Sequence, residues 1–478
     1  MSQLSAEQSL PRVAVLILNY NGWRFLPTCL TALAATEYPR ELLDVVVIDN
    51  ASHDDSVAQV RAQFPWVRVL ALSRNLGFAG GNNAGIRAND APYDVLLNND
   101  TAVEPGWLMP LVAAAQADPA VGACGAKLVY FFETLPVTLT VASAFRPADA
   151  LPGSDDGRVL GVRLAEAALS AAHDASGAAV SYATGWYDQE RAGDLSYRWS
   201  AERATLELPI ADRGAPLELT LRFAGGPPAP LPPARGEIAI GASVLKTVAI
   251  GAEPLAVSLT IPPALLAHAE RLIQNAGQEL LPGGYTRDRG SFNQNGVEQH
   301  VRDGVYERQE EVFGLCGAAV LLRRRMLDQI GLLDDRFFMY YEDIDLCWRA
   351  RSAGWRMVYV PAAVVRHVHS GSSGAWSPFF RFHVERNRLL MLIKNAPSGL
   401  ARRAVTDYLS DTLAWTGRSL RALRHGLRPA RANLAFVRNN LRVLASLLAA
   451  LPYALRDRRT IRRRATVDDA AILAWTVR

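Results

Sequence analysis

Four short runs of aliphatic and β-branched residues, separated by helix-length segments, dominate the first hundred residues. The runs are Val13–Tyr20, Asp44–Asp49, Val67–Leu72 and Tyr93–Asn98. Apolar runs of this length are typical of strands that are buried on both faces. Their alternation with helices predicts βαβ units and a parallel sheet, which is an α/β fold of Rossmann-like organisation.

Each of these runs ends in polar residues. In open parallel sheets, ligands bind beyond the carboxyl ends of the strands. The strand ends should therefore meet at one polar edge, next to a glycine-rich loop whose backbone N–H groups can approach a ligand closely. The candidate ligand-binding residues are Asn19, Asn21, Asp49, Asn50, Arg74, Asn75, Gly77, Asn83 and Asn99.

The chain changes character between about residues 131 and 271, which are rich in Pro, Gly and Ala. Period-two runs such as Leu217–Phe223 and Leu255–Ile261 predict short antiparallel strands of a sandwich or barrel. Mixed α/β character returns from Val312, so this segment is most simply an inserted β-sandwich. We therefore expect one half of an α/β domain at 1–130, the sandwich at 131–271, the second half at 272–376 and a helical region at 377–478.

The helical region is strongly basic, although the formal net charge of the chain is only +4. From residue 401 onward there are sixteen arginines and five aspartates. Arginines between leucines, as in Leu434–Leu455, favour an anionic membrane surface as partner. A packed helical subdomain with a solvated basic face explains the pattern as well. The run Val443–Leu451 is shorter than the roughly 20 residues that span a bilayer, so we expect no membrane crossing.

The remaining composition bears on the compartment. The four cysteines stand far apart, which disfavours a disulfide framework and a zinc cluster. The amino terminus lacks a basic region followed by an apolar run, so no secretory signal is predicted. We expect a cytoplasmic protein, peripheral on the inner face of the plasma membrane. No nucleic-acid partner is expected, because the basic tail lacks regularly interleaved aromatic residues.

Two aspartates follow buried strands. Asp100 is placed to grip a divalent cation, or to cap the helix expected after Glu104. Asp49 is placed to accept hydrogen bonds from a ribose or base, or again to cap a helix. The sequence around each aspartate leaves both explanations open.

Three further carboxylates, Glu342, Asp343 and Asp345, stand among apolar and aromatic residues. Burial raises carboxyl pKa values, as a general base for a hydroxyl group requires. On a helix, Glu342 and Asp345 project to one side and Asp343 elsewhere, so one of the three can face a cleft. An acidic first turn, favoured by the helix dipole, explains Glu342 and Asp345 without any chemistry.

Two histidines, His367 and His369, follow a pair of strand-like runs. A single histidine in such a place is more often structural. A histidine at a strand end can, however, complete a metal site with Asp100, because imidazole is a good ligand for manganese-like ions. Of the two we favour His367.

Seven motifs, taken in order, resemble those of the inverting family 2 glycosyltransferases, particularly their rhamnosyltransferase-like branch. The resemblance covers roughly residues 11–129 and 273–375. It implies a GT-A fold, a nucleoside diphosphate-sugar donor and a Mn²⁺ or Mg²⁺ ion. The motifs are VLILNYNG, VVVIDNAS, NLGFAGGNNAGI, LLNNDT, CGAAVLLRRRML, FFMYYEDIDLCWRARSAGW and VVRHVHSGSSG.

The resemblance also implies residue roles. Asp343 corresponds to the catalytic base, Asp49 to the nucleotide-binding acid, and Asp100 with His367 to the metal site. The base would deprotonate an acceptor hydroxyl for a single inverting displacement at the anomeric carbon. The implied acceptor contacts are Gly317, Glu342 and Trp348.

Two departures from the family pattern stand out. The turn before Asp100 reads Asn98-Asn99 where many relatives have a second aspartate, which removes one metal ligand. The insertion is absent from the simplest members. A cover, a carbohydrate contact and an oligomer contact are all open roles for it, and we favour the first two equally.

The expected function is transfer of rhamnose or a related hexose to a surface-glycan or lipid-linked acceptor. The Gln-x-x-Arg-Trp signature of processive synthases is missing, which favours transfer of one or a few sugars. The alternative is a non-catalytic glycan-binding protein that uses the β-sandwich.

Overall fold

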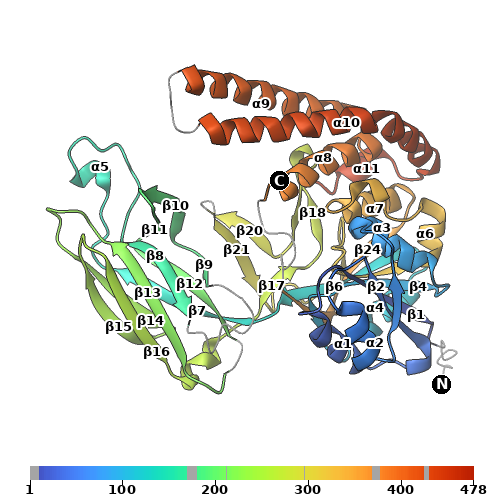
Figure 1. Cartoon of the computed structure of the whole chain (residues 1–478), viewed down its shortest axis with the longest axis horizontal. Coiled ribbons are helices and arrows are strands. Elements are labelled where there is room, and N and C mark those ends of the chain that lie inside the picture. The colour runs from blue at the N-terminus through green and yellow to red at the C-terminus, as the bar shows by residue number, and fades with distance from the viewer. Residues whose placement is uncertain are drawn as a thin grey trace, which may run out of the picture. The chain divides into compact units, whose positions relative to one another are not determined.

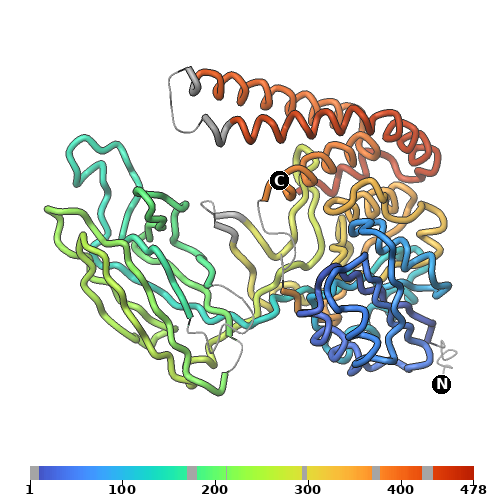
Figure 2. The backbone as a smooth tube through the Cα atoms, viewed as in Figure 1, coloured from blue at the N-terminus to red at the C-terminus, as the bar shows by residue number. Residues whose placement is uncertain are grey.

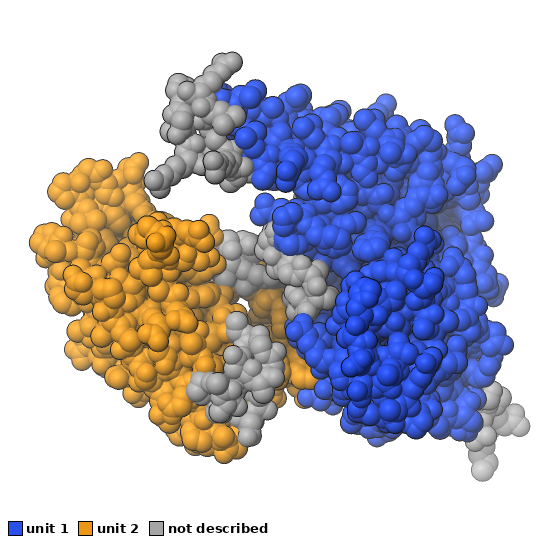
Figure 3. Space-filling view, in the orientation of Figure 1, with its two compact units in different colours: residues 1–129, 275–289, 306–478 blue, residues 130–274, 290–305 orange. Residues whose placement is uncertain are grey.

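The computed structural model describes residues 10–169, 180–210, 213–294, 297–368, 377–424 and 430–477. The chain forms two compact units, which Figure 3 colours separately and through which Figure 2 traces the backbone. The first unit consists of residues 1–129, 275–289 and 306–478, and the second of 130–274 and 290–305. The predicted four-region boundaries stay a prediction, and His369 lies outside the described residues.

A parallel sheet forms the centre of the first unit, as the sequence predicts. Strand β1 (Val13–Asn19) lies between β4 (Tyr93–Asn98) and β2 (Leu43–Asp49), and β3 (Arg68–Ala71) follows β2. The register aligns Asn19 with Asp49, so these strand ends share one edge. The predicted convergence of polar strand ends is confirmed.

Antiparallel strands from the second half of the chain complete this sheet. Strand β23 (Ala319–Arg323) lies between β4 and β6 (Val121–Tyr130) and pairs with both. Strand β24 (Arg356–His367) pairs with the short β5 (Thr101–Val103). The sheet is therefore mixed, and segments on both sides of the insertion build it, in agreement with the expected α/β class.

Helices cover both faces of the sheet, because successive strand residues point to opposite sides. Helices α1 (Leu26–Ala34) and α4 (Leu108–Ala117) contribute to a core on one face. Helix α3 (Gly77–Arg87) packs on the other face, where Gly81 lies so close to Leu18 that a larger side chain would clash. Glycines in this helix thus serve close helix–sheet packing.

The C-terminal region is helical, as expected, and belongs to the first unit. Helices α9 (Ser398–Arg424) and α10 (Ala430–Arg464) lie side by side (Figure 1), and the Tyr408 hydroxyl donates to Asn440 Oδ1 at 3.1 Å. Helix α8 (Pro378–Asn395) shares a core with α7 (Glu342–Ser352) and α10.

One described helix segment, Leu434–Arg464, is long and apolar enough to cross a membrane by length and composition. This segment is longer than the run Val443–Leu451, because leucines and alanines on both sides extend the apolar stretch past Arg442. The expectation that the chain does not cross a membrane stays a prediction.

The second unit contains two five-stranded antiparallel sheets that share one hydrophobic core, which includes Trp186 and Phe223. This is the expected β-sandwich. One sheet has the order β10-β11-β8-β13-β16 and the other β15-β14-β7-β12-β9. The strands are β7 (Glu133–Val141), β8 (Arg163–Leu169), β9 (Ser181–Tyr182), β10 (Trp186–Ala192), β11 (Leu195–Ser200), β12 (Arg203–Ile210), β13 (Leu217–Gly225), β14 (Ala234–Ile240), β15 (Ser243–Ile250) and β16 (Leu255–Ile261).

The remaining elements are short. They are η1 (Arg40–Leu42), α2 (Ser56–Gln63), α5 (Pro147–Ala150), η2 (Pro263–His268), β17 (Leu272–Asn275), β18 (Gln278–Leu280), η3 (Pro282–Gly284), β19 (Thr286–Asp288), β20 (Ser291–Gln294), β21 (Val297–Arg302), β22 (Glu310–Glu311), α6 (Arg324–Ile330), η4 (Asp335–Phe337) and α11 (Asp469–Leu473).

Candidate active site

A network of amide side chains occupies the carboxyl edge of the parallel sheet. Asn19 is fully buried, and its Oδ1 accepts a hydrogen bond of 2.8 Å from Asn99 Nδ2. Its Nδ2 lies 3.4 Å from Asp49 Oδ1 and 3.3 Å from Ser52 Oγ. The Ser52 hydroxyl also accepts from the Asn21 backbone N–H at 2.9 Å. The ends of β1, β2 and β4 are thereby tied into one rigid polar surface.

Asp100 and His367 come together at the same edge. Pairing of β24 with β5 places His367 opposite Thr101, and His367 Nε2 lies 3.1 Å from Asp100 Oδ1. Nε2 also lies 3.3 Å from Asn98 Nδ2. Both members of the pair are largely buried. Because a strand follows Asp100 directly and α4 begins only at Leu108, Asp100 is not a helix cap.

The Asp100–His367 pair offers one carboxylate and one imidazole to a cation. Among the described residues there is no group of three or more His, Cys, Asp and Glu side chains arranged to hold a metal. Mg²⁺ and similar ions are commonly bound through one or two protein ligands, with waters and substrate phosphates completing the coordination. The pair therefore fits an ion that arrives with a phosphorylated ligand.

The glycine-rich loop is anchored by Asn50. Asn50 Nδ2 donates to Asn75 Oδ1 at 2.9 Å and to the Gly77 carbonyl at 3.2 Å, and Asn50 Oδ1 accepts from the Leu76 N–H at 2.8 Å. Gly77 has φ of +71°, and a Cβ there would lie 2.4 Å from the Phe338 carbonyl oxygen. Only glycine fits this position without strain.

Asp343 faces this loop from the start of α7. Its Oδ2 accepts from the Gly317 N–H at 3.2 Å. The carbonyl of Ala318, the residue after Gly317, accepts from the Asn98 N–H at 2.9 Å. Gly317 also lies against the Phe78 ring. Gly317 thus joins the carboxylate to the end of β4 and to the glycine-rich loop.

The three neighbouring carboxylates have different electrostatic environments. Burial raises the pKa of Asp343, although backbone N–H groups of Ile344 and Gly317 oppose the shift. Burial and the nearby Asp343 carboxylate raise the pKa of Glu342 well above its ordinary value. Burial opposes ionisation of Asp345 too, but Lys394 and Arg349 hold its pKa below the ordinary value. Asp345 is paired with two cations, so its environment does not suit a proton acceptor. The raised pKa of Asp343 does suit that role.

The segment before α7 is held in an unusual conformation. Phe338, Tyr340 and Tyr341 have φ of 63°, 71° and 69°, a region that non-glycine residues rarely occupy. The fully buried Asn387 of α8 donates from Nδ2 to three carbonyls of this segment, at distances of 2.8 to 2.9 Å. The Phe338 carbonyl in turn accepts from the Phe78 N–H of the glycine-rich loop at 2.6 Å.

Some residues chosen from the sequence do not face this edge. Trp348 is 1% exposed and packs edge-on against Phe313 in the core of α7, α8 and α10, so the structure does not bring it to the site as an acceptor contact. The buried Asn83 exchanges hydrogen bonds with the Leu333 backbone, at 2.7 and 3.1 Å, rather than facing the edge. Arg74 lies exposed in the loop after β3.

Other residues of the site were missed from the sequence. Ser52 lies in the motif VVVIDNAS, and its position three residues after Asp49 could have identified it as a residue of the site. Gln278, whose side chain hydrogen bonds to Asp343, and Asn387 lie 65 residues before and 44 residues after the carboxylate. No local pattern marks either residue, because only the tertiary fold brings them near α7.

Comparison with protein families finds two matches, one on each side of the central part of the sandwich, and both extend into the second unit. The model "Glycosyl transferase family 2" matches residues 14–153, and "Glycosyltransferase like family 2" matches residues 286–385.

Curated relatives match over shorter segments. An "N-acetylglucosaminyl-diphospho-decaprenol L-rhamnosyltransferase" of Mycobacterium tuberculosis is 36% identical over 117 residues, which cover 24% of this chain and 37% of that protein. The "Rhamnosyltransferase WbbL" of Escherichia coli (strain K12) is 37% identical over 86 residues, covering 18% of this chain and 32% of that protein. The chain thus spans about a third of the length of these relatives.

Among solved structures, that of GalNAc-T7 with UDP, GalNAc and Mn²⁺ is similar, with 11% identity and a TM-score of 0.44. The similarity covers 86% of this chain and 51% of that one.

Proposed function

Because the chain belongs to glycosyl transferase family 2, we propose that it transfers a sugar from a nucleoside diphosphate-sugar to an acceptor hydroxyl, with inversion at the anomeric carbon. One observation supports the proposal: hydrogen bonds through Gly317, Ala318 and Asn98 link the Asp343 carboxylate to the edge of the sheet that carries the Asp100–His367 pair. A cation held by the Asp100–His367 pair would suit the leaving diphosphate, and the Asp343 carboxylate would suit the attacking hydroxyl.

On the donor side, Asp100 and His367 would hold a Mn²⁺ or Mg²⁺ ion, which neutralises charge on a leaving diphosphate. The interlocked Asn19, Asp49 and Asn99 side chains present fixed polar groups to the nucleotide. Side chains that are already hydrogen-bonded to one another pay little further entropy to bind a ligand.

On the acceptor side, Asp343 would take the proton of the attacking hydroxyl. Its raised pKa makes it a stronger base than an ordinary aspartate. In one displacement the acceptor oxygen bonds to the anomeric carbon, the bond to the diphosphate breaks, and the proton moves to the carboxylate.

The substrates are proposed from the relatives. Both named relatives are rhamnosyltransferases, so we propose rhamnose or a related hexose as the donor sugar. The name of the mycobacterial relative specifies a lipid-linked diphosphate acceptor. A lipid-linked or surface-glycan acceptor suits a cytoplasmic enzyme that lies on the inner membrane face through its basic C-terminal helices.

The first test is calorimetric binding of a panel of donors, dTDP-rhamnose, UDP-galactose and GDP-mannose among them, with and without Mn²⁺. We expect one donor to bind in a metal-dependent way. Asp100→Ala should weaken that binding about tenfold or more, because one of two protein ligands is lost. Failure of folded wild-type protein to bind any donor would contradict the proposal and favour glycan binding by the sandwich.

A second test separates the base from the donor site. Asp343→Asn should lower kcat by about 10²-fold or more, because amide oxygen is a poor proton acceptor, while the donor Kd stays within twofold. The measurements are steady-state transfer with the bound donor and calorimetry on the same sample. Retained turnover would assign the base to another carboxylate.

A further inference from the structure

A cavity of about 350 Å³ lies in the first unit, and none of the residues assigned to sugar transfer lines it. Its walls are the loop Ile330–Arg336, the end of α7, Lys394 of α8 and the C-terminal part of α10. The α10 residues that line it include Tyr453, Arg456 and Arg464.

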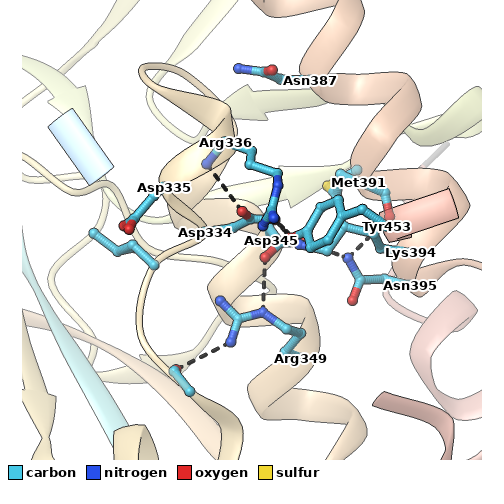
Figure 4. A network of polar contacts seen from close by, with 12 residues as sticks. Asp334, Asp335, Arg336, Asp345, Arg349, Asn387, Met391, Lys394, Asn395 and Tyr453 are labelled. Atoms are coloured by element: carbon cyan, nitrogen blue, oxygen red, sulfur yellow. Dashed lines mark hydrogen bonds and ion pairs between the residues drawn. The ribbon is translucent and has the colours of Figure 1, made fainter. Parts of the chain in front are cut away.

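Two cations of the wall are already neutralised. Lys394, which is 1% exposed, pairs with Asp334 at 2.6 Å and with Asp345 at 2.9 Å. Arg349 pairs with Asp345 at 2.8 Å. Figure 4 shows these side chains gathered around the two aspartates, with Tyr453 beside them. This ion-paired network forms one side of the cavity and carries little net charge.

Three other cations of the lining are not neutralised. Arg336 stacks on the Tyr453 ring at 3.6 Å, and Arg456 lies 5.9 Å from the same ring. Arg464 completes the set. Within the described ranges, none of the three guanidinium groups has a carboxylate in ion-pair distance. Of the lining carboxylates, Asp334 is neutralised by Lys394. Asn83 hydrogen bonds to Asp335 but carries no charge, so Asp335 and Asp457 stand against three arginines, an excess of one positive charge.

We propose that this cavity binds a phosphate or diphosphate group. Guanidinium groups match phosphate oxygens in bidentate geometry, and the excess of positive charge favours an anion over a neutral ligand. The hydroxyl of Thr460, which donates to the Arg456 carbonyl at 3.4 Å, also lines the cavity. The volume exceeds that of a phosphate alone and leaves room for an organic substituent.

The cavity is connected to the glycine-rich loop by its own lining. The Leu333 backbone exchanges hydrogen bonds with the Asn83 side chain, which also donates to Asp335. An anion that braces the loop Ile330–Arg336 would therefore steady α3, which opens at the donor edge. The effect on α3 and the donor edge rests on the proposed function, whereas binding of the anion to the cavity does not.

The phosphate can be carried by a soluble molecule or by a lipid headgroup. Helix α10 exposes Leu441, Leu448 and Leu455 along the turns that lead to Arg456. A lipid chain could lie on these leucines while its phosphate enters the cavity. The same three arginines serve both sources.

The test is calorimetric binding of inorganic pyrophosphate in the presence of EDTA, which removes any contribution from a metal at Asp100. The full chain is compared with the pair Arg456→Ala/Arg464→Ala and with the matched pair Arg459→Ala/Arg463→Ala. Both pairs remove two exposed charges from α10, but only the first lines the cavity. We expect the cavity pair to weaken binding about tenfold or more and the matched pair less than twofold.

Two further readouts complete the design. Pyrophosphate should slow amide exchange in residues 331–337 and 76–83 of the wild type and not of the cavity pair. Sedimentation with phosphatidylcholine vesicles, with and without phosphatidylglycerol, identifies the source. Loss of anionic-vesicle binding in the cavity pair alone indicates a lipid headgroup, and unchanged vesicle binding indicates a soluble ligand.

Equal weakening by both pairs would overturn the proposal, because it would reduce the site to general electrostatics. Absence of binding by wild-type protein to pyrophosphate and to anionic vesicles would also overturn it. Neither result touches the donor panel, so this proposal and that of sugar transfer fail independently.

Discussion

Glu342, Asp343 and Asp345 are neighbours in the sequence, yet they differ in what surrounds them. Asp345 receives Lys394 and Arg349, Asp343 receives the Gly317 N–H, and Glu342 Oε2 is buried without a hydrogen-bond partner among the described residues. The sequence predicted that one carboxylate of the three faces a cleft, which stays a prediction. It could not predict which of the three is paired with cations, because Lys394 comes from another helix.

Glu342→Gln should make the protein more stable at pH 8. Burial and Asp343 raise the pKa of Glu342, so its stabilising contribution is present below the ordinary carboxyl pKa and is lost as pH rises through the raised value. Glutamine stays neutral throughout. We expect a gain on the order of 1 kcal/mol or more at pH 8 that vanishes near pH 4, measured by urea unfolding. A less stable variant at pH 8 would mean that the ionised form is stabilised.

At the scale of elements, periodicity predicted the strands but not their partners. The runs that became β1, β2 and β4 were recognisable from composition, and their parallel order followed from the helices between them. Insertion of β23 between β4 and β6 was not foreseen, because no local pattern records a pairing across the sandwich. That pairing also positions Gly317, whose role the motif alone did not explain.

The strained segment before α7 depends on α8. Asn387→Ala removes the amide that holds three carbonyls, and buried groups left without partners cost about 1–3 kcal/mol each. We expect a loss of roughly 2–4 kcal/mol in the free energy of unfolding and a lower kcat, with the donor Kd little changed. Asn387→Asp, which keeps an acceptor but loses the donor, should behave like alanine.

Recovery of kcat in Asn387→Asp would contradict this account, because that side chain cannot donate to the three carbonyls when ionised. Unfolding in urea and transfer kinetics on one preparation separate a loss of stability from a loss of positioning.

At the scale of the whole molecule, the C-terminal helices of the first unit present an apolar surface. Leu413, Leu441 and Leu448 are 72%, 55% and 70% exposed, and arginines stand between them along α9 and α10. Leu441 and Leu448 are seven residues apart, which places them on one face of α10. Monomeric soluble proteins rarely expose a large contiguous apolar surface without a use. The sequence suggested a basic amphipathic region but left a packed subdomain equally open, since exposure is decided by tertiary packing.

Leu441→Gln/Leu448→Gln should reduce binding to vesicles that contain phosphatidylglycerol by about tenfold or more, because burial of each leucine contributes roughly 1.5–3 kcal/mol. Co-sedimentation at two salt concentrations is the measurement. Leu195→Gln/Val244→Gln, in exposed positions of the sandwich, is the matched control. Equal binding by both variants would assign the interaction to arginines alone.

The place of β23 between β4 and β6 has a consequence for how the chain is made. On the ribosome, β6 is complete at Tyr130, but the strand that joins it to β4 begins only at Ala319. At roughly 5–20 residues per second, that strand follows about ten to forty seconds later. During that interval the whole sandwich is synthesised while the edges of β4 and β6 lack their partner. The order of synthesis thus sets a window in which the nascent chain presents unpaired strand edges, and a chaperone that covers such edges would act there.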